Sequence, residues 1–260
     1  MLTPGYRSKR FSWLCTLGFE FSVELGAYEI MPTDSVERFI RLLKKSPGGA
    51  VFNPWWQVDA LNDIGRNAPA IRRKQLAAYL RKRIGKAKLV VIGEALGYRG
   101  GHFSGIPMTS ERILLGKKKD DGIKSEHVFS SIQPRRTSKR EHCPDGFSEP
   151  TATIVWSSLL GLGLTPEQFV LWNAFPWHSF DPRRGKLSNR MPTKKEQSAG
   201  LSVLKTFLDL FSCDEIVALG NVAASQLEKL NVESHRVRHP ASGGAKLFRQ
   251  QIGKIVTKVG

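Results

Sequence analysis

Short apolar runs alternate with longer amphipathic segments along most of this chain. Four runs have the length and composition of buried strands: residues 89–92, 169–172, 215–219 and 234–238. Six segments space their apolar residues as a helix does: residues 33–45, 68–85, 151–160, 193–211, 222–230 and 244–255. Strands that alternate with helices predict an α/β fold with an open, mainly parallel four-stranded sheet and helices on both faces.

The stretches between these segments indicate how the chain is divided. We expect residues 1–30 to form an N-terminal arm and residues 31–260 to form a single α/β domain. Residues 117–150 are polar, rich in Lys and Arg and interrupted by prolines, which predicts a long basic loop within that domain.

The charge of the chain indicates its partner. Forty Lys and Arg against 23 Asp and Glu give a net charge of +17, and this favours a polyanion such as DNA, because neutralised phosphates release counterions. The basic loop and one helix face, with Arg72, Arg73, Arg81 and Arg83, are the predicted phosphate contacts. No apolar stretch approaches the roughly 20 residues of a membrane span. We expect a soluble monomer in the cytoplasm, associated with the nucleoid if bacterial, with no membrane partner.

Cysteine usage argues against a bound metal. Cys15, Cys143 and Cys213 are far apart, and no Cys-x-x-Cys pair is present. This spacing predicts free thiols, and it offers no ligand set for a zinc ribbon or an iron–sulfur cluster. We expect no metal and no cofactor.

Polar residues follow three of the predicted strands. Glu94 comes directly after the first strand, Asn173 after the second and His239 after the last, and Phe103 follows Glu94 in a glycine-rich stretch. The carboxyl ends of parallel strands meet at one edge of a sheet, so these side chains should lie close together. An acid, a flat ring, an amide and an imidazole at one edge are suited to a pocket for a nucleobase.

In order and spacing these segments resemble the motifs of the uracil-DNA glycosylase superfamily. The resemblance is carried by Gly93-Glu94-Ala95, Phe103, Asn173 and His239-Pro240-Ala241-Ser242, and the strand and helix layout agrees from about residue 70 to 259. It implies that uracil is flipped out of DNA and its N-glycosidic bond hydrolysed, which leaves an abasic site.

The resemblance also implies roles for individual residues. Phe103 would stack on uracil, Asn173 would bind its O4 and N3 edge, and His239 would donate to O2 as a catalytic residue with Glu94. Ala95 and Tyr98 would belong to the base-binding set. The expected DNA contacts are Ser104, Lys139, Arg140 and Ser242.

The first motif departs from the better-known branches of the family. Ala95 stands where one branch has the Asp that positions water, and Gly97 stands where one branch has the Tyr that excludes thymine. The residue that activates water is therefore open: Glu94 is the first candidate and Glu111 the second, and a water held by the backbone is the third alternative. The cysteine count excludes the iron–sulfur branch.

Two other functions fit the same residues. One is a slow or non-catalytic protein that binds damaged or abasic DNA, since the usual Asp is missing. The other is a glycosylase for a different deaminated base, hypoxanthine or xanthine. Time-dependent release of base would distinguish an enzyme from the binding protein. Oligonucleotides with different lesions would distinguish a uracil glycosylase from one that acts on hypoxanthine or xanthine.

Overall fold

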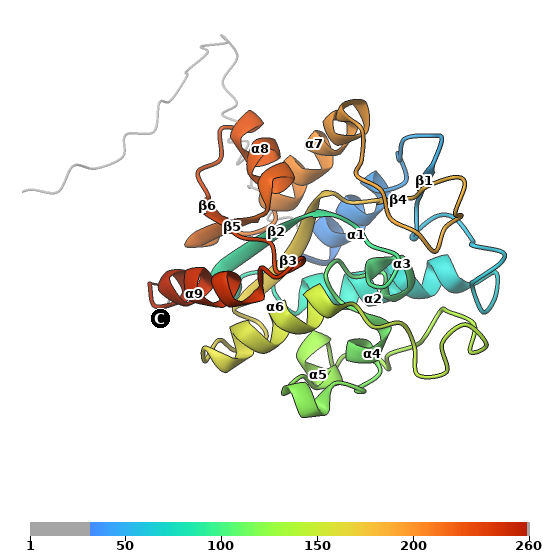
Figure 1. The fold of residues 1–260 in the computed structure, drawn as a ribbon, viewed down its shortest axis with the longest axis horizontal. Helices are drawn as coiled ribbons and strands as arrows, with labels where there is room; N and C mark the ends of the chain where they lie inside the picture. Colours follow the sequence, from blue (N-terminus) through green and yellow to red (C-terminus); the bar gives the residue numbers. More distant parts are fainter. Residues whose placement is uncertain (1–31, 259–260) are drawn as a thin grey trace, which may run out of the picture. The chain divides into compact units, whose positions relative to one another are not determined.

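A four-stranded parallel sheet lies at the centre of the fold (Figure 1). The computed structural model describes residues 32–258, so the predicted arm of residues 1–30 lies outside the described part. The strands are β2 (Leu89–Ala95), β3 (Phe169–Phe175), β5 (Glu215–Leu219) and β6 (His235–Val237), in the order β3-β2-β5-β6. This confirms the predicted fold class.

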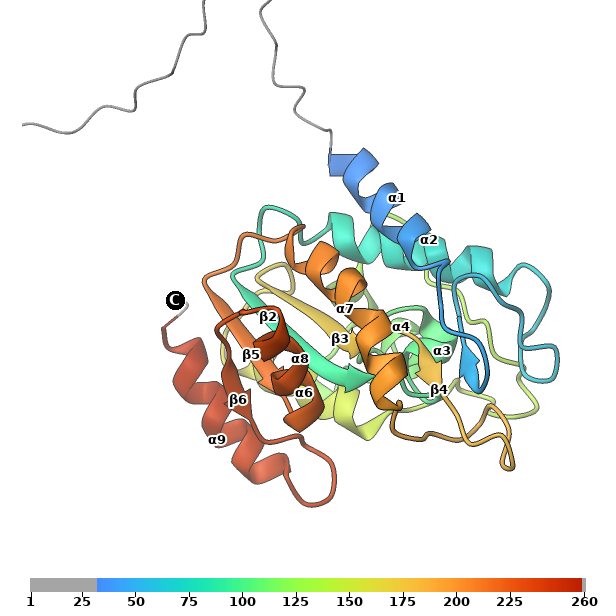
Figure 2. The same ribbon diagram turned by 90° about the horizontal axis from the view of Figure 1, so that it is seen from above.

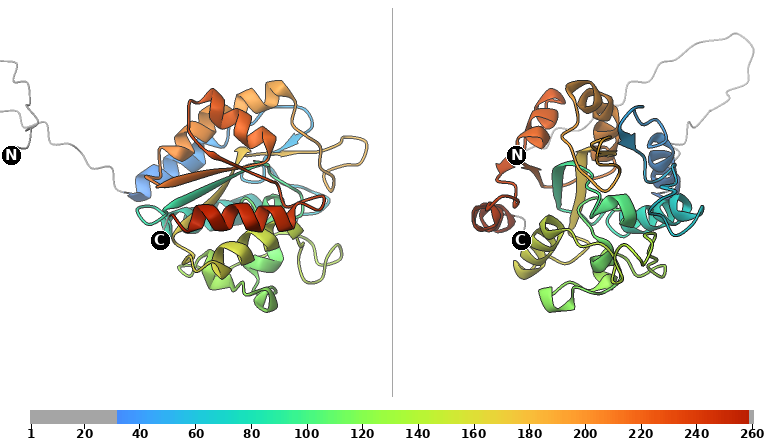
Figure 3. Two further views of the ribbon diagram at one scale, coloured as in Figure 1. Left: turned by 60° about the vertical axis from the view of Figure 1, so that its left-hand side comes forward. Right: turned by 45° about the vertical axis from the view of Figure 1, so that its right-hand side comes forward.

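Longer helices cover both faces of the sheet. They are α1 (Pro32–Leu42), α2 (Ala68–Arg81), α6 (Pro150–Gly161), α7 (Lys194–Leu208), α8 (Asn221–Lys229) and α9 (Ala245–Val256). Helices α7 and α8 lie on one face and α2, α6 and α9 on the other, while α1 packs against both α2 and α7 (Figures 2 and 3). The two layers of helices leave the carboxyl ends of the strands as the edge where a site can form.

The helices begin at residues suited to the start of a helix. Pro150 is the first residue of α6, where its missing N–H costs nothing. Thr193 caps α7 by accepting from the Glu196 N–H, and the Glu196 carboxylate accepts in return from the Thr193 N–H at 2.7 Å. These local signals explain why the predicted helix positions agree with the observed ones.

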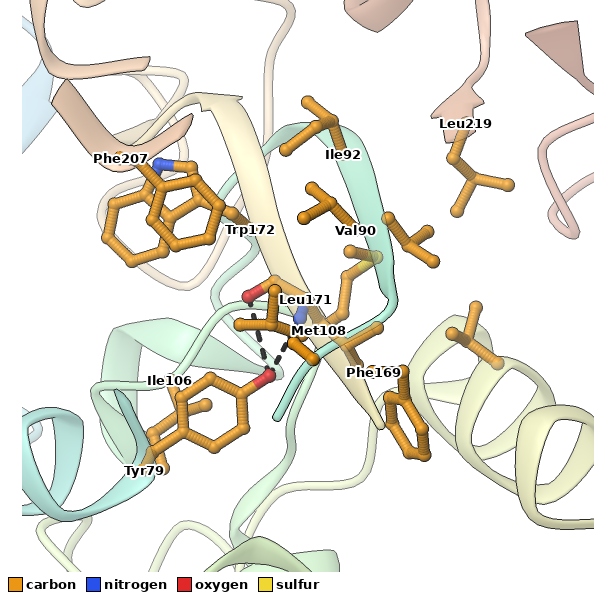
Figure 4. Packing of buried hydrophobic residues seen from close by; sticks show 14 of the residues in the cluster. Tyr79, Val90, Ile92, Ile106, Met108, Phe169, Leu171, Trp172, Phe207 and Leu219 are labelled. Carbon is orange, nitrogen blue, oxygen red and sulfur yellow. Dashed lines mark hydrogen bonds between the residues drawn. The ribbon is translucent and has the colours of Figure 1, made fainter. Parts of the chain in front are cut away.

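The open edge of β3 is closed by Tyr79 of α2 (Figure 4) and by Arg83, which follows that helix. The buried Tyr79 hydroxyl accepts from the Leu171 N–H at 2.7 Å and faces the Leu171 carbonyl at 3.5 Å. The Arg83 guanidinium donates to the Phe169 carbonyl at 2.9 Å and also to carbonyls of Tyr79, His127 and Val128. Because β3 is the edge strand, these bonds satisfy backbone groups that have no neighbouring strand.

Short elements fill the segments that the sequence left as loops. A second, antiparallel pair is formed by β1 (Val51–Phe52) and β4 (His178–Ser179). Four short helical pieces are α3 (Gly101–Ser104), α4 (Glu111–Leu114), η1 (Lys119–Asp121) and α5 (Ser125–Val128). The basic segment is fastened to the body of the domain by Glu111, whose carboxylate accepts from the N–H groups of Thr137 and Ser138.

The prediction that four arginines of one basic helix face contact phosphates is wrong for two of them. Arg72 and Arg83 are fully buried. Arg72 pairs with Asp63 at 2.5 Å and donates to the His102 carbonyl, whereas Arg83 is surrounded by carbonyl groups. Of the other two, Arg81 pairs with Glu37. Neither buried guanidinium can reach a phosphate. Within residues 32–258, no helix is long and apolar enough to cross a membrane.

We expect Tyr79→Phe to lower the free energy of unfolding by about 1–3 kcal/mol, because it leaves the buried Leu171 N–H without a partner. Denaturant unfolding of the two proteins measures the difference. Tyr98→Phe is the matched control, since its hydroxyl accepts only from the neighbouring Arg99 at the surface. An equal effect of both changes would contradict the role of Tyr79 at the strand edge.

Candidate functional site

A cavity of about 350 Å³ lies at the carboxyl ends of β2 and β3. Its wall includes the first motif, residues 93–97, together with Asn173 and His239. Four of the predicted site residues, Glu94, Ala95, Asn173 and His239, are thus brought together from three separate strand ends. Met108, Val222 and the loop residues Asn189 to Pro192 complete much of the remaining wall.

Asn173 of β3 lies beside Gly93 of the neighbouring strand β2, its partner in the parallel register. A Cβ atom at Gly93 would lie 2.5 Å from the amide of Asn173, so only glycine leaves room for this side chain. The hydrogen-bond pattern orients the amide: its oxygen accepts from the Leu96 N–H and its nitrogen donates to the Trp172 carbonyl, each at 3.2 Å. One lone pair and one N–H of the amide remain for a ligand.

Glu94 is held against the start of helix α8. Its Oε1 accepts from the Val222 N–H at 3.2 Å, in the first turn of that helix. Gly220 makes this approach possible, because a Cβ there would lie 2.5 Å from Oε1. The start of α8 thus holds the Glu94 side chain in place through a backbone hydrogen bond.

His239 is held as a hydrogen-bond donor. Its Nδ1 accepts from the Ala241 N–H at 3.1 Å, so the neutral ring carries its proton on Nε2. Burial lowers the pKa of His239 below its ordinary value of 6.5, and nearby Glu94 opposes that shift only partly. At neutral pH the ring is therefore uncharged, with an N–H that is not used by Ala241.

A second cavity of about 700 Å³ adjoins the first and shares Glu94, His239 and Ala241 with it. Exposed Arg236 and Arg238 line this outer groove, as does Ser242, which has a φ of +52°. Sequence reasoning predicted Ser242 but not the two arginines. The exposure of Arg236 and Arg238 could have been predicted from the sequence. The two arginines alternate with the buried Val237 at the last strand, and alternate positions point away from the core.

Phe103 and Ser104 do not line either cavity. Both lie in α3 with no exposed surface. The Phe103 ring stacks on Phe147 with centroids 4.6 Å apart, and the Ser104 hydroxyl bonds the Ile106 backbone. We therefore correct two predictions: the base-stacking face of Phe103 is covered by another ring, and Ser104 is too deeply buried to contact DNA.

The other predicted residues lie outside the cavity walls. Tyr98 is partly exposed, and its N–H donates to Asn189. Lys139 is held by the Leu61 carbonyl at 2.8 Å, and Arg140 is exposed on the same segment. Glu111 is fully buried, with its carboxylate engaged by the basic segment. Of the two acids considered for water activation, Glu94 alone lines the cavity.

Sequence reasoning missed Glu149, which also lines the inner cavity. Burial raises the pKa of its carboxyl to about 7. In the sequence Glu149 is visible only as the residue before Pro150 at a helix start, and nothing there indicates where its side chain points. No group of three His, Cys, Asp or Glu side chains that could hold a metal ion occurs in the part of the chain that the structure describes.

Comparisons with known proteins concern the family and the fold of the chain. The family model of the uracil DNA glycosylase superfamily matches residues 83–257. The crystal structure of wild-type Pedobacter heparinus SMUG2 matches with a TM-score of 0.57 and 15% identity, over 86% of this chain and 97% of that chain. At that identity the likeness concerns the fold. No curated protein matches the sequence.

We expect Glu94→Gln to lower the pKa of His239 further, because it removes the negative charge that opposes the effect of burial. Titration of the His239 ring followed by NMR measures this shift. Glu141→Gln, at an exposed position remote from the cavity, is the control and should leave the titration unchanged. A His239 pKa at or above 6.5 in the unmodified protein would contradict the account of a neutral donor.

Proposed function

The chain belongs to the uracil DNA glycosylase superfamily, and from this premise we propose that it is a DNA glycosylase that hydrolyses the N-glycosidic bond of uracil in DNA. The observation that carries the proposal is the convergence of Glu94, Asn173 and His239 on one cavity. A base inside a duplex stack cannot reach such a cavity, so the nucleotide must be flipped out of the helix or be single-stranded already.

Asn173 is proposed to bind the edge of the base. The N–H and the lone pair left free on its amide complement the O4 acceptor and the N3–H donor of uracil. Cytosine presents the opposite pattern, with an amino group at position 4 and an unprotonated N3. An amide held in place by Leu96 and Trp172 cannot turn over without losing both bonds, which supports discrimination between the two bases.

His239 is proposed to stabilise the leaving group. As the bond from C1′ to N1 breaks, its electron pair moves to the base and negative charge develops on O2. A neutral Nε2–H donates to that oxygen and favours the transition state over the ground state. A single preorganised donor of this kind contributes about 3 kcal/mol to lowering the barrier.

Glu94 is proposed to serve the sugar side of the reaction. It lies where the inner cavity meets the outer groove, so the deoxyribose of a flipped nucleotide would pass beside it. Its carboxylate stabilises the positive charge that develops on the sugar and orients the water whose oxygen bonds to C1′. The proton of that water passes to the carboxylate or to solvent.

The outer groove is proposed to hold the DNA backbone. Arg236 and Arg238 are exposed there, and Ser242 lies beside them on the segment that follows His239. Their position next to the inner cavity suits the phosphates that flank a flipped nucleotide. Arg140 remains a predicted contact of the basic segment, outside both cavities.

We expect the protein to release uracil from a uracil-containing oligonucleotide, detected as alkali-sensitive cleavage, and Asn173→Asp to lose at least about a hundredfold in rate. The reason is that a carboxylate offers no donor to O4, which leaves a polar pair unsatisfied inside the cavity. Asn67→Asp, an exposed change of the same kind, is the control. No cleavage at stoichiometric protein would refute the activity, and unchanged excision by Asn173→Asp would remove Asn173 from the base site.

We expect Arg238→Gln to weaken DNA binding about equally for all sequences and to reduce the slope of log affinity against log salt by about 1, as the loss of one phosphate contact does. Fluorescence anisotropy with a labelled duplex at several salt concentrations measures both quantities. Arg66→Gln changes an exposed charge away from both cavities and should have a smaller effect. Equal effects of the two substitutions would place the DNA elsewhere.

A further inference from the structure

The inner cavity contains one carboxyl group to which the proposed reaction assigns no task. Glu149 lines the cavity, and its Oε2 is buried without a hydrogen-bond partner among the described residues. Glu149 occupies the N-cap position of α6, but its side chain does not cap that helix. An unsatisfied buried polar atom is costly to the folded protein unless something else binds it.

The first motif and the residues after it leave room for this carboxyl. A Cβ atom at Gly100 would overlap the Glu149 carboxyl, and one at Gly97 would lie 3.1 Å from Oε1. Two glycines therefore open the space that the carboxyl occupies beside the cavity. Gly93 of β2 makes room for Asn173 in the same way, so glycines within residues 93–100 admit both polar side chains.

No charge partner explains the position of Glu149. The titratable groups on the other walls are Glu94 and His239 across the cavity and Arg190 on the loop after β4. Glu94 is engaged by Val222 and Arg190 is paired with Glu196 at 2.6 Å. Among the described residues no ion pair involves Glu149, so its buried Oε2 is open to a hydrogen bond with a ligand in the cavity.

We propose that Glu149 is a specificity-determining residue that contacts the flipped base, as a second hydrogen-bonding group beside Asn173. The inference rests on the proposed function, because it requires a base in this cavity. Its carboxyl donates to a carbonyl oxygen of the base, a group that uracil carries at C4 and cytosine does not.

The protonation state of Glu149 is consistent with a donor. Burial raises the pKa of its carboxyl to about 7, so the group is neutral and carries an O–H below that pH. Above that pH the carboxylate has no proton to donate, so its negatively charged oxygens repel the carbonyl oxygen of the base. Binding of uracil should therefore weaken as the pH rises through about 7.

The test compares the unmodified protein with Glu149→Gln, Glu149→Ala and Gly100→Ala, and uses Glu141→Gln as the control. Excision is measured on oligonucleotides that contain uracil, hypoxanthine or xanthine, from about pH 6 to about pH 8, with kcat and KM separated. Binding of free uracil is measured by NMR at the two ends of that range. Burial lowers the pKa of His239 below its ordinary value of 6.5, and the comparison with Glu149→Gln, which keeps His239, separates any titration of His239 from that of Glu149.

We expect uracil binding and kcat/KM of the unmodified protein to fall as the pH rises through about 7. Glu149→Gln keeps an N–H donor, so it should retain activity and lose this pH dependence. Glu149→Ala should lose about tenfold to a hundredfold in kcat/KM for uracil. Gly100→Ala should fold and show a similar loss, because it displaces the carboxyl without removing it.

Two results would overturn the inference while leaving the proposed function intact. The first is uracil excision that is unchanged in rate and pH profile by both Glu149 substitutions. The second is activity that rises through pH about 7 and is abolished in Glu149→Gln, which would make Glu149 a base that activates water. If the unmodified protein excises none of the three bases, the proposed function fails. In that case the binding of free uracil tests the inference alone. The inference holds if the unmodified protein binds uracil more weakly at the higher pH and Glu149→Gln does not, and it fails if both behave alike.

Discussion

The geometry of the site depends on the hydrogen bonds that close the open edge of β3. This strand carries Asn173, and on one side it has no neighbouring strand to hold its backbone. Tyr79 of α2 and Arg83, just beyond the end of that helix, supply the missing partners and so fix where β3 lies against β2. With that register set, Asn173 comes to lie opposite Gly93, the one residue type that leaves space for its amide. Side chains that bond the edge strand thus help to set the position of Asn173 in the cavity wall.

Three titratable groups share the site, and their surroundings act on each of them in a different way. At the start of α8 the Val222 N–H donates to the Glu94 carboxylate. Burial keeps His239 neutral and a backbone bond selects its tautomer. Burial raises the pKa of Glu149, whose Oε2 has no hydrogen-bond partner among the described residues. All three groups line one cavity, so side chains with different hydrogen-bonding capacity surround the same space.

Much of this fold could be predicted from the sequence, because strands and helices here follow simple periodicity. The convergence of Glu94, Asn173 and His239 could be predicted too, since parallel strands end at one edge. The burial of particular polar and charged side chains could not be predicted from the sequence. Arg83 has the spacing of a solvent-exposed helix residue, but its guanidinium is enclosed where backbone carbonyls need donors. Phe103 has the position of a stacking residue, but the short helix α3 directs it inward onto Phe147.

The glycines of the site have a common physical role that their sequence context alone does not reveal. Gly93, Gly100 and Gly220 each lie against a polar side chain that comes from a different segment of the chain. In each case a Cβ atom would displace the amide of Asn173 or the carboxyl of Glu149 or Glu94. A glycine-rich motif at a strand end is usually interpreted as a turn. Here the glycines provide the space for polar side chains that come from other segments of the chain.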